Sequence, residues 1–152
     1  MFVAGQILYF RPFHFKNGRE SKNKFFIILK NINDVIIVAS LPTKVNNAPS
    51  LIDKSHGCIN YNDRKFNCYV FEQGRIVCEN GFSFNLHTFV YGNQVDNYDV
   101  INMTSIEEGE KYDLMGVLNK DEFNALIYCI INNNSTKTKI KKLLNSSLAP
   151  KF

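Results

Sequence analysis

Hydrophobic and polar residues alternate in short runs over the first hundred positions, which is typical of β-strands. Residues 6–13 are apolar and β-prone, and Pro12 marks an edge strand or a strand end. Residues 24–30 contain a continuous apolar run, which is typical of a strand buried on both faces. A turn at 31–34 and an apolar run at 35–40 follow, so this part of the chain predicts an antiparallel hairpin.

Shorter strands are predicted at 58–60, 67–71, 75–78 and 88–91, with Asn80-Gly81 as a turn. Many short strands at this spacing favour a small, strongly bent barrel over a parallel sheet. We therefore expect a small, strongly bent barrel in the first two thirds of the chain.

The C-terminal part changes to helical spacing. Residues 120–132 predict a helix whose apolar stripe is Phe123, Leu126, Ile127, Ile130 and Ile131. Asn119 is the candidate N-cap, and Asp121 and Glu122 place negative charge in the first turn, where the helix dipole favours it. A second stripe at Ile140, Leu143 and Leu144 lies on a basic segment. The expected fold is mainly β with C-terminal helices (α+β), one domain over 1–152 with the barrel at about 5–104 and the helices at about 119–147.

Composition limits the class of protein. The chain has 152 residues, of which 45% are hydrophobic, enough for one domain with a core of its own. It contains neither an apolar run of membrane-spanning length nor a signal-peptide pattern, so we expect no membrane association. Four sparse cysteines without a secretion signal predict reduced thiols in a cytoplasmic protein.

The distribution of charge is more informative than the net charge of +4. One basic cluster consists of Arg11, Lys16, Arg19, Lys22, Lys24 and Lys30, opposed only by Glu20. Clustered cations raise the local potential and bind phosphates. A second basic segment, 137–151, contains no acid, and we interpret it as a solvated face rather than a binding site.

Metal and cofactor chemistry is not favoured by the spacing of potential ligands. His56-x-Cys58 is followed by Cys68 and Cys78 at intervals of ten, but a structural zinc site usually has a close cysteine pair. Cysteines in apolar strands are more often small buried hydrophobes. The glycines are isolated, so no phosphate-binding loop is present. We expect no metal and no cofactor.

One arrangement does predict chemistry. The loop after residue 13 offers His14, Lys16, Arg19, Lys22 and Lys24, and the end of the 35–40 strand offers Ser40, Thr43 and Lys44. If these strands are adjacent, the loop places cations beside a hydroxyl group. Such a site suits phosphodiester transesterification, in which negative charge accumulates on the non-bridging phosphate oxygens. RNA supplies its own 2′-hydroxyl nucleophile, and His14 or a loop cation is the candidate for proton transfer.

Short segments along most of the chain resemble the MazF/PemK-like toxins. These segments are Gly5-Gln6-Ile7-Leu8, the basic loop 17–24 before the apolar run, Leu41-Pro42-Thr43, Gln94-Val95-Asp96 and Gly116-Val117-Leu118. Lys24-Phe25 stands where family members often have Arg-Pro. The resemblance implies an SH3-like barrel of the PemK/MazF toxin type.

The resemblance also implies a function. Toxins of this family are metal-independent endoribonucleases of type II toxin–antitoxin systems, and they act as homodimers that a cognate antitoxin inhibits. By this similarity Arg19 stabilises phosphate charge, Thr43 positions the phosphate, and Lys24 or His14 assists. The RNA-binding candidates are Lys16, Lys22, Lys44 and Ser40. The alternative is a non-catalytic SH3-like barrel that binds a protein or a nucleic acid in regulation or phage defence.

Overall fold

The computed structural model describes residues 2–13, 22–32, 35–41, 55–61, 66–99 and 112–146. Its elements, in chain order, are β1 (Gln6–Phe13), β2 (Lys22–Ile32), β3 (Val35–Ser40), β4 (Gly57–Tyr61), β5 (Phe66–Phe71), β6 (Thr88–Val90), the 3-10 helix η2 (Gly92–Gln94), β7 (Val95–Asp99), β8 (Tyr112–Val117), α2 (Lys120–Ile131) and α3 (Thr138–Asn145). The protein is therefore mainly β with two C-terminal helices, as the sequence predicts.

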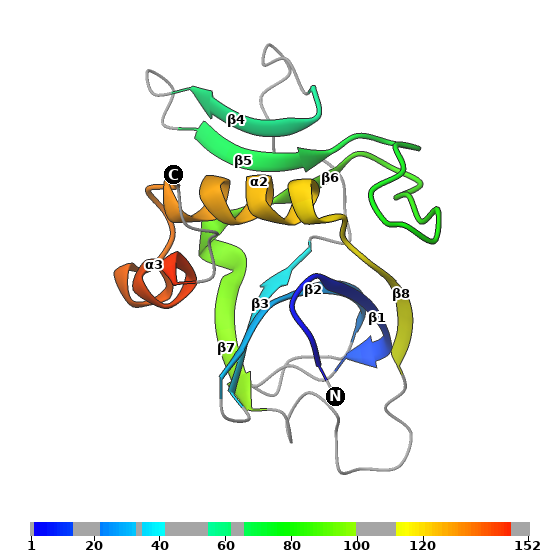
Figure 1. Ribbon diagram of the computed structural model, residues 1–152, viewed down its shortest axis with the longest axis horizontal. Coiled ribbons are helices and arrows are strands. Elements are labelled where there is room, and N and C mark those ends of the chain that lie inside the picture. Colours follow the sequence, from blue (N-terminus) through cyan, green and yellow to red (C-terminus); the bar gives the residue numbers. More distant parts are fainter. Residues whose placement is uncertain are drawn as a thin grey trace.

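Two antiparallel sheets contain these strands. The larger sheet has five strands in the order β7-β3-β2-β1-β8, and the smaller has three in the order β4-β5-β6. Figure 1 shows that the larger sheet is strongly curved and that α2 lies between the larger sheet and the smaller sheet. The described strands thus form two separate sheets, and neither is closed into the barrel expected from the spacing of the strands.

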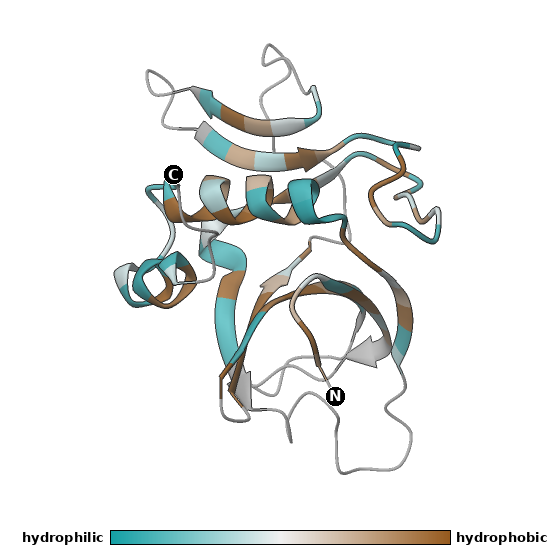
Figure 2. Ribbon diagram, viewed as in Figure 1, coloured by the Kyte–Doolittle hydropathy of each residue, from teal (hydrophilic) through white to brown (hydrophobic). Residues whose placement is uncertain are grey.

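Strand β2 runs through the middle of the larger sheet and is buried on both faces, which confirms the interpretation of its continuous apolar run. Phe26 and Ile28 pack on one face with Phe10, whereas Ile27 and Leu29 join the main core on the other face. All four β2 side chains are fully buried. Figure 2 shows the hydrophobic character of β2 and β3. The predicted hairpin is also confirmed, because β2 and β3 pair antiparallel.

The first helix, α2, joins the two sheets. Its side chains Leu126, Ile127 and Ile130 are buried in the main core. The helix begins after Asn119, the predicted cap, although the Asn119 side chain makes no capping hydrogen bond. Instead, the Asn119 carbonyl accepts a hydrogen bond from the Phe123 N–H at 2.8 Å. Within the described ranges, no helix combines the length and the apolar character needed to cross a membrane.

Three strand assignments differ from the sequence-based expectation. Residues 75–78 do not form a strand; Cys78 makes an isolated bridge to Leu118 and the rest is irregular. Strands β7 and β8 were not predicted, yet they form the two edges of the larger sheet. Both pair with predicted strands, β3 and β1, and this pairing supplies the order that the irregular patterns of their own sequences do not signal.

Candidate functional site

Most of the predicted site falls on residues that the structure does not describe. His14, Lys16, Arg19, Thr43 and Lys44 lie outside the described residues. Lys22 begins β2, but its side chain is not described either. The structure therefore places two of the predicted residues, Lys24 and Ser40.

Lys24 and Ser40 lie on the same face of the larger sheet, at the end where β2 begins and β3 ends. Ser40 pairs directly with Phe26 across β2 and β3. Lys24 is two residues before Phe26, so its side chain points to the same face. Lys24 is therefore a diagonal neighbour of Ser40, with about 7–8 Å between their Cα atoms. Ser40 is buried and Lys24 is half-buried. The register of β2 and β3 thus brings one predicted cation and one predicted hydroxyl group to the same face of the sheet. The position of the basic loop beside them stays a prediction, because that loop lies outside the described residues.

Aromatic rings continue this face toward the edge of the sheet. Phe10 pairs with Lys24 on one side and with Tyr112 of β8 on the other. The centroid of the Phe10 ring lies 5.2 Å from that of Tyr112 and 5.6 Å from that of Phe26. Lys24 and Tyr112 are two strand spacings apart, so the distance between their backbones is about 10 Å. An apolar surface beside Lys24 lowers the local dielectric constant and strengthens any attraction between its ammonium group and an anion.

Tyr112 is a residue that sequence reasoning missed. It is 37% exposed although its ring also packs on Phe2, with the centroids 5.5 Å apart. A partly exposed ring in line with a cation is a suitable platform for a nucleobase. The position of Tyr112 beside Phe10 follows from the pairing of β1 with β8, and the local sequence does not predict that pairing.

A second group of polar side chains, His56, Tyr69 and Glu122, lies between the smaller sheet and α2. The His56 Nε2 atom is 2.8 Å from Glu122 Oε2, and the Tyr69 hydroxyl donates to the same oxygen. The Glu72 N–H donates to His56 Nδ1 at 3.1 Å, so Nδ1 carries no proton and Nε2 provides the hydrogen that Glu122 accepts. Burial, together with the hydrogen bond to Glu122, raises the pKa of Tyr69 well above its usual range.

Every polar group of this cluster is engaged by the fold itself. Both His56 nitrogens have partners, and Glu122 accepts from two side chains. His56 has no ring nitrogen left to accept a proton without losing a hydrogen bond, so a structural role in holding the smaller sheet on α2 is favoured over acid–base catalysis. Among the described residues, no group of three or more His, Cys, Asp or Glu side chains has a metal-binding arrangement.

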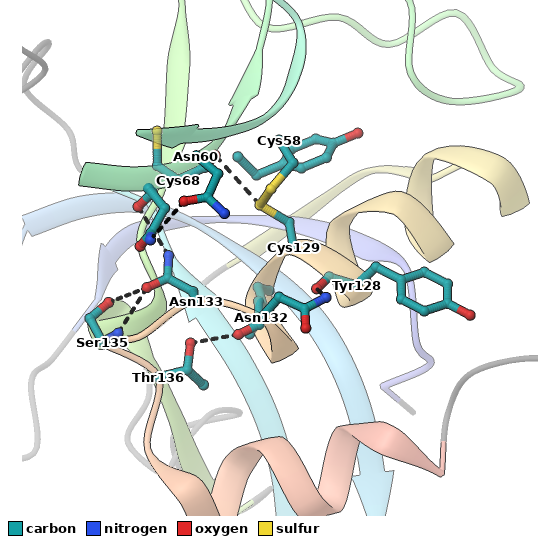
Figure 3. Close-up of a disulfide and its surroundings, with 12 residues drawn as sticks. Cys58, Asn60, Cys68, Tyr128, Cys129, Asn132, Asn133, Ser135 and Thr136 are labelled. Carbon is teal, nitrogen blue, oxygen red and sulfur yellow. Dashed lines mark hydrogen bonds between the residues drawn. A yellow bond between two sulfur atoms is a disulfide. The ribbon is translucent and has the colours of Figure 1, made fainter. Parts of the chain in front are cut away.

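A disulfide bond joins Cys58 of β4 to Cys129 near the end of α2, with the two Cα atoms 5.6 Å apart. Figure 3 shows this bond bridging the strand and the helix. The expectation of four reduced thiols is therefore wrong for this pair. Cys68 and Cys78 are free and buried, and burial raises the pKa of Cys68 to about 12 and that of Cys78 to about 11.

A cleft of about 540 Å³ lies beside β8 and the start of α2. Its lining includes Leu114, Val117 and Lys120. The turn at 78–81 packs closely against β8 here: a Cβ atom on Gly116 would come within 2.9 Å of Cys78 Sγ. Leu114 and Val117 are 54% and 45% exposed. The cleft therefore combines exposed apolar side chains with an edge strand, which is a surface suited to a protein partner.

Comparison with protein-family models, with curated proteins and with solved structures gave no match.

Proposed function

We propose that this chain is the toxin of a type II toxin–antitoxin system and acts as a metal-independent endoribonuclease. The observation that carries the proposal is the position of Lys24 and Ser40 on one face, at the end of β2 and β3 where the predicted basic loop is attached. The curled five-stranded sheet with α2 against it supports a divergent SH3-like barrel of the PemK/MazF type.

In the proposed reaction, the 2′-hydroxyl of RNA attacks the adjacent phosphorus. The P–O2′ bond forms and the P–O5′ bond breaks, which leaves a 2′,3′-cyclic phosphate and a free 5′-hydroxyl. Lys24, with Arg19 from the loop, stabilises the charge that grows on the non-bridging oxygens. Ser40 and Thr43 donate hydrogen bonds that position the phosphate. His14 or Lys24 transfers the proton that leaves the 2′-hydroxyl and is returned to O5′.

The proposed partners are RNA, a cognate antitoxin and a second copy of the chain in a homodimer, and the proposed location is the cytoplasm. Cytosolic reductants keep most protein thiols reduced. The Cys58–Cys129 bond argues against this location.

A second candidate function is a non-catalytic module that binds another protein. The exposed Leu114 and Val117 beside the cleft favour it, because contiguous exposed apolar surface at an edge strand marks interaction sites. This function needs neither Lys24 nor Ser40.

Induced expression, with growth and total RNA integrity followed together, separates the two functions. We expect the wild-type chain to arrest growth while RNA is fragmented. Lys24→Gln and Ser40→Ala should each reduce cleavage by about 100- to 1000-fold if each removes a preorganised donor. Arg75→Gln, which removes an exposed cation outside both candidate sites, is the control and should behave as wild type. Growth arrest with intact RNA in the wild type would contradict the ribonuclease and favour the binding module.

A further inference from the structure

The strongest unassigned feature is the exposed side of α3. Lys139, Lys141 and Lys142 lie on this helix and Lys137 precedes it. No aspartate or glutamate occurs after Glu122 in the sequence. We call these four lysines the α3 lysine face.

The other side of α3 is already occupied by the core. Ile140 and Leu144 are buried in the main cluster, and Leu143 packs partly against it. Figure 2 shows hydrophilic residues alternating with these hydrophobic ones along α3. Because its apolar side is inside the protein, α3 has no hydrophobic face to insert into a membrane. What it presents outward is charge.

The charge at the start of α3 opposes helix stability. Lys137 occupies the N-cap and Lys139 lies in the first turn, which contains no acid. Cations at this end of a helix are unfavourable because they oppose the helix dipole, and Lys137 and Lys141 are also like charges four residues apart. Lys137 pairs with Asp96 at 3.5 Å, but both side chains are exposed, so the pair contributes little. Among the described residues, no acidic side chain pairs with Lys139, Lys141 or Lys142.

The α3 lysine face is fixed relative to the proposed cleavage site. Lys30 Nζ donates to the Leu143 carbonyl at 2.8 Å and to the Ser146 hydroxyl, which ties the end of α3 to β2. Lys24 lies on the same strand, six residues away, which corresponds to about 20 Å. One strand therefore connects the two basic regions of the protein.

The sequence alone predicts a solvated face for this segment, but its fixed position on β2 changes that interpretation. We propose that the α3 lysine face is a second contact surface for the phosphate backbone of RNA, outside the cleavage site. The choice of RNA as the ligand rests on the proposed function. Lysines contact phosphates as point charges, without a demand for base identity. Bound phosphates would also relieve the repulsion within the helix. The surface therefore holds the substrate some distance from the cleaved bond and adds affinity without sequence preference.

The test measures binding of a fluorescent 2′-O-methyl RNA 20-mer, which lacks the attacking hydroxyl, over a range of salt concentrations. The variant is the triple substitution Lys139→Gln/Lys141→Gln/Lys142→Gln. If each lysine contacts one phosphate, the slope of log affinity against log salt should flatten by about 0.7 per lysine, or roughly two units in total. Single variants Lys142→Gln and Arg75→Gln each remove one exposed cation, and only the first should weaken binding.

Thermal unfolding of the same variants controls for folding. Lys139 in the first turn opposes the helix dipole and Lys142 in the last turn favours it, so the two effects offset each other and the triple variant should unfold at about the same temperature as wild type. Identical salt slopes for wild type and a folded triple variant would overturn the proposal. The proposal would also be overturned if the wild-type protein bound polyglutamate but not RNA and the triple variant lost that binding. This result would indicate an acidic protein as the ligand. A wild-type chain that cleaves no RNA but binds it through α3 would refute the ribonuclease and leave this surface in place.

Discussion

His56 Nε2 lies 2.8 Å from Glu122 Oε2, so the residue that precedes β4 is bound to the first turn of α2. Seven residues further along the helix, about 10 Å, Cys129 bonds to Cys58 of the same strand region. The smaller sheet is thus attached to α2 at both ends of the helix, once by a polar cluster and once by a covalent bond.

Loss of the polar attachment should destabilise the fold. Glu122→Ala leaves the Tyr69 hydroxyl and the His56 Nε2–H without their acceptor in a largely buried site. We expect the free energy of unfolding to fall by about 1–3 kcal/mol, measured by urea denaturation. Glu122→Gln keeps one acceptor oxygen and should lose less. Asp121→Ala, on the exposed side of the same turn, is the control, and an equal loss in both alanine variants would contradict the role of Glu122.

The state of the cysteines can be counted directly. Protein purified without reductant should show two reactive thiols after denaturation, from Cys68 and Cys78, and four after denaturation with reduction. Before denaturation, labelling should be slow, because both free thiols are buried and the thiolate is the reactive form. Mass spectrometry of maleimide-labelled protein gives each count. Four thiols in the denatured, unreduced and air-oxidised protein would show that Cys58 and Cys129 do not pair.

The buried thiols predict a loss of stability at alkaline pH. Burial raises the pKa of Cys68 from 9.0 to about 12, so between these values the unfolded chain releases a proton that the folded protein keeps. The free energy of unfolding should therefore fall as the pH rises above about 9, by up to about 1.4 kcal/mol per pH unit for this thiol. Cys68→Ala should flatten the curve of stability against pH. A curve with the same slope in wild type and variant would show that Cys68 does not contribute.

The elements that were predicted correctly are those in which the pattern of buried residues follows the local pattern of apolar residues in the sequence. Phe26 to Leu29 form an unbroken apolar run, and α2 has a regular helical stripe, so both positions follow from periodicity alone. Strand β8 was missed because its sequence lacks the alternation of polar and apolar residues that marks a strand, and Gly116 interrupts it. The Cys58–Cys129 bond joins residues 71 positions apart, and only the packing of β4 on α2 brings them together.

The same distinction applies to the candidate site. Ser40 and Lys24 could be placed on one face because the hairpin of β2 and β3 fixes their register. Tyr112 could not, since its place beside Phe10 depends on the pairing of β1 with a strand about 100 residues later in the chain. His56 and Glu122 meet only when the smaller sheet packs on α2. Contacts between residues that are distant in the sequence cannot be predicted from local sequence patterns.

The burial of β2 gives a direct test of the core. Ile28 is fully buried on the face opposite α2, so Ile28→Asp would place a charge without a partner in an apolar environment. We expect the loss of several kcal/mol and an unfolded or aggregated protein. Val3→Asp is the control, because Val3 is 54% exposed and should tolerate the charge. Circular dichroism and gel filtration report the outcome, and a cooperatively folded Ile28→Asp variant would refute the assignment.

The most direct test of the proposed ribonuclease is cleavage of end-labelled RNA by the purified protein in excess EDTA. The substrate is compared with the same RNA carrying a single 2′-deoxynucleotide at the cleaved position. We predict cutting without added metal, products that end in 2′,3′-cyclic phosphate, and no cutting at the deoxy position, because the 2′-hydroxyl is the nucleophile. Cleavage that needs a metal ion, that leaves 3′-hydroxyl ends or that proceeds at the deoxy position would contradict the proposal, as would intact RNA under all these conditions.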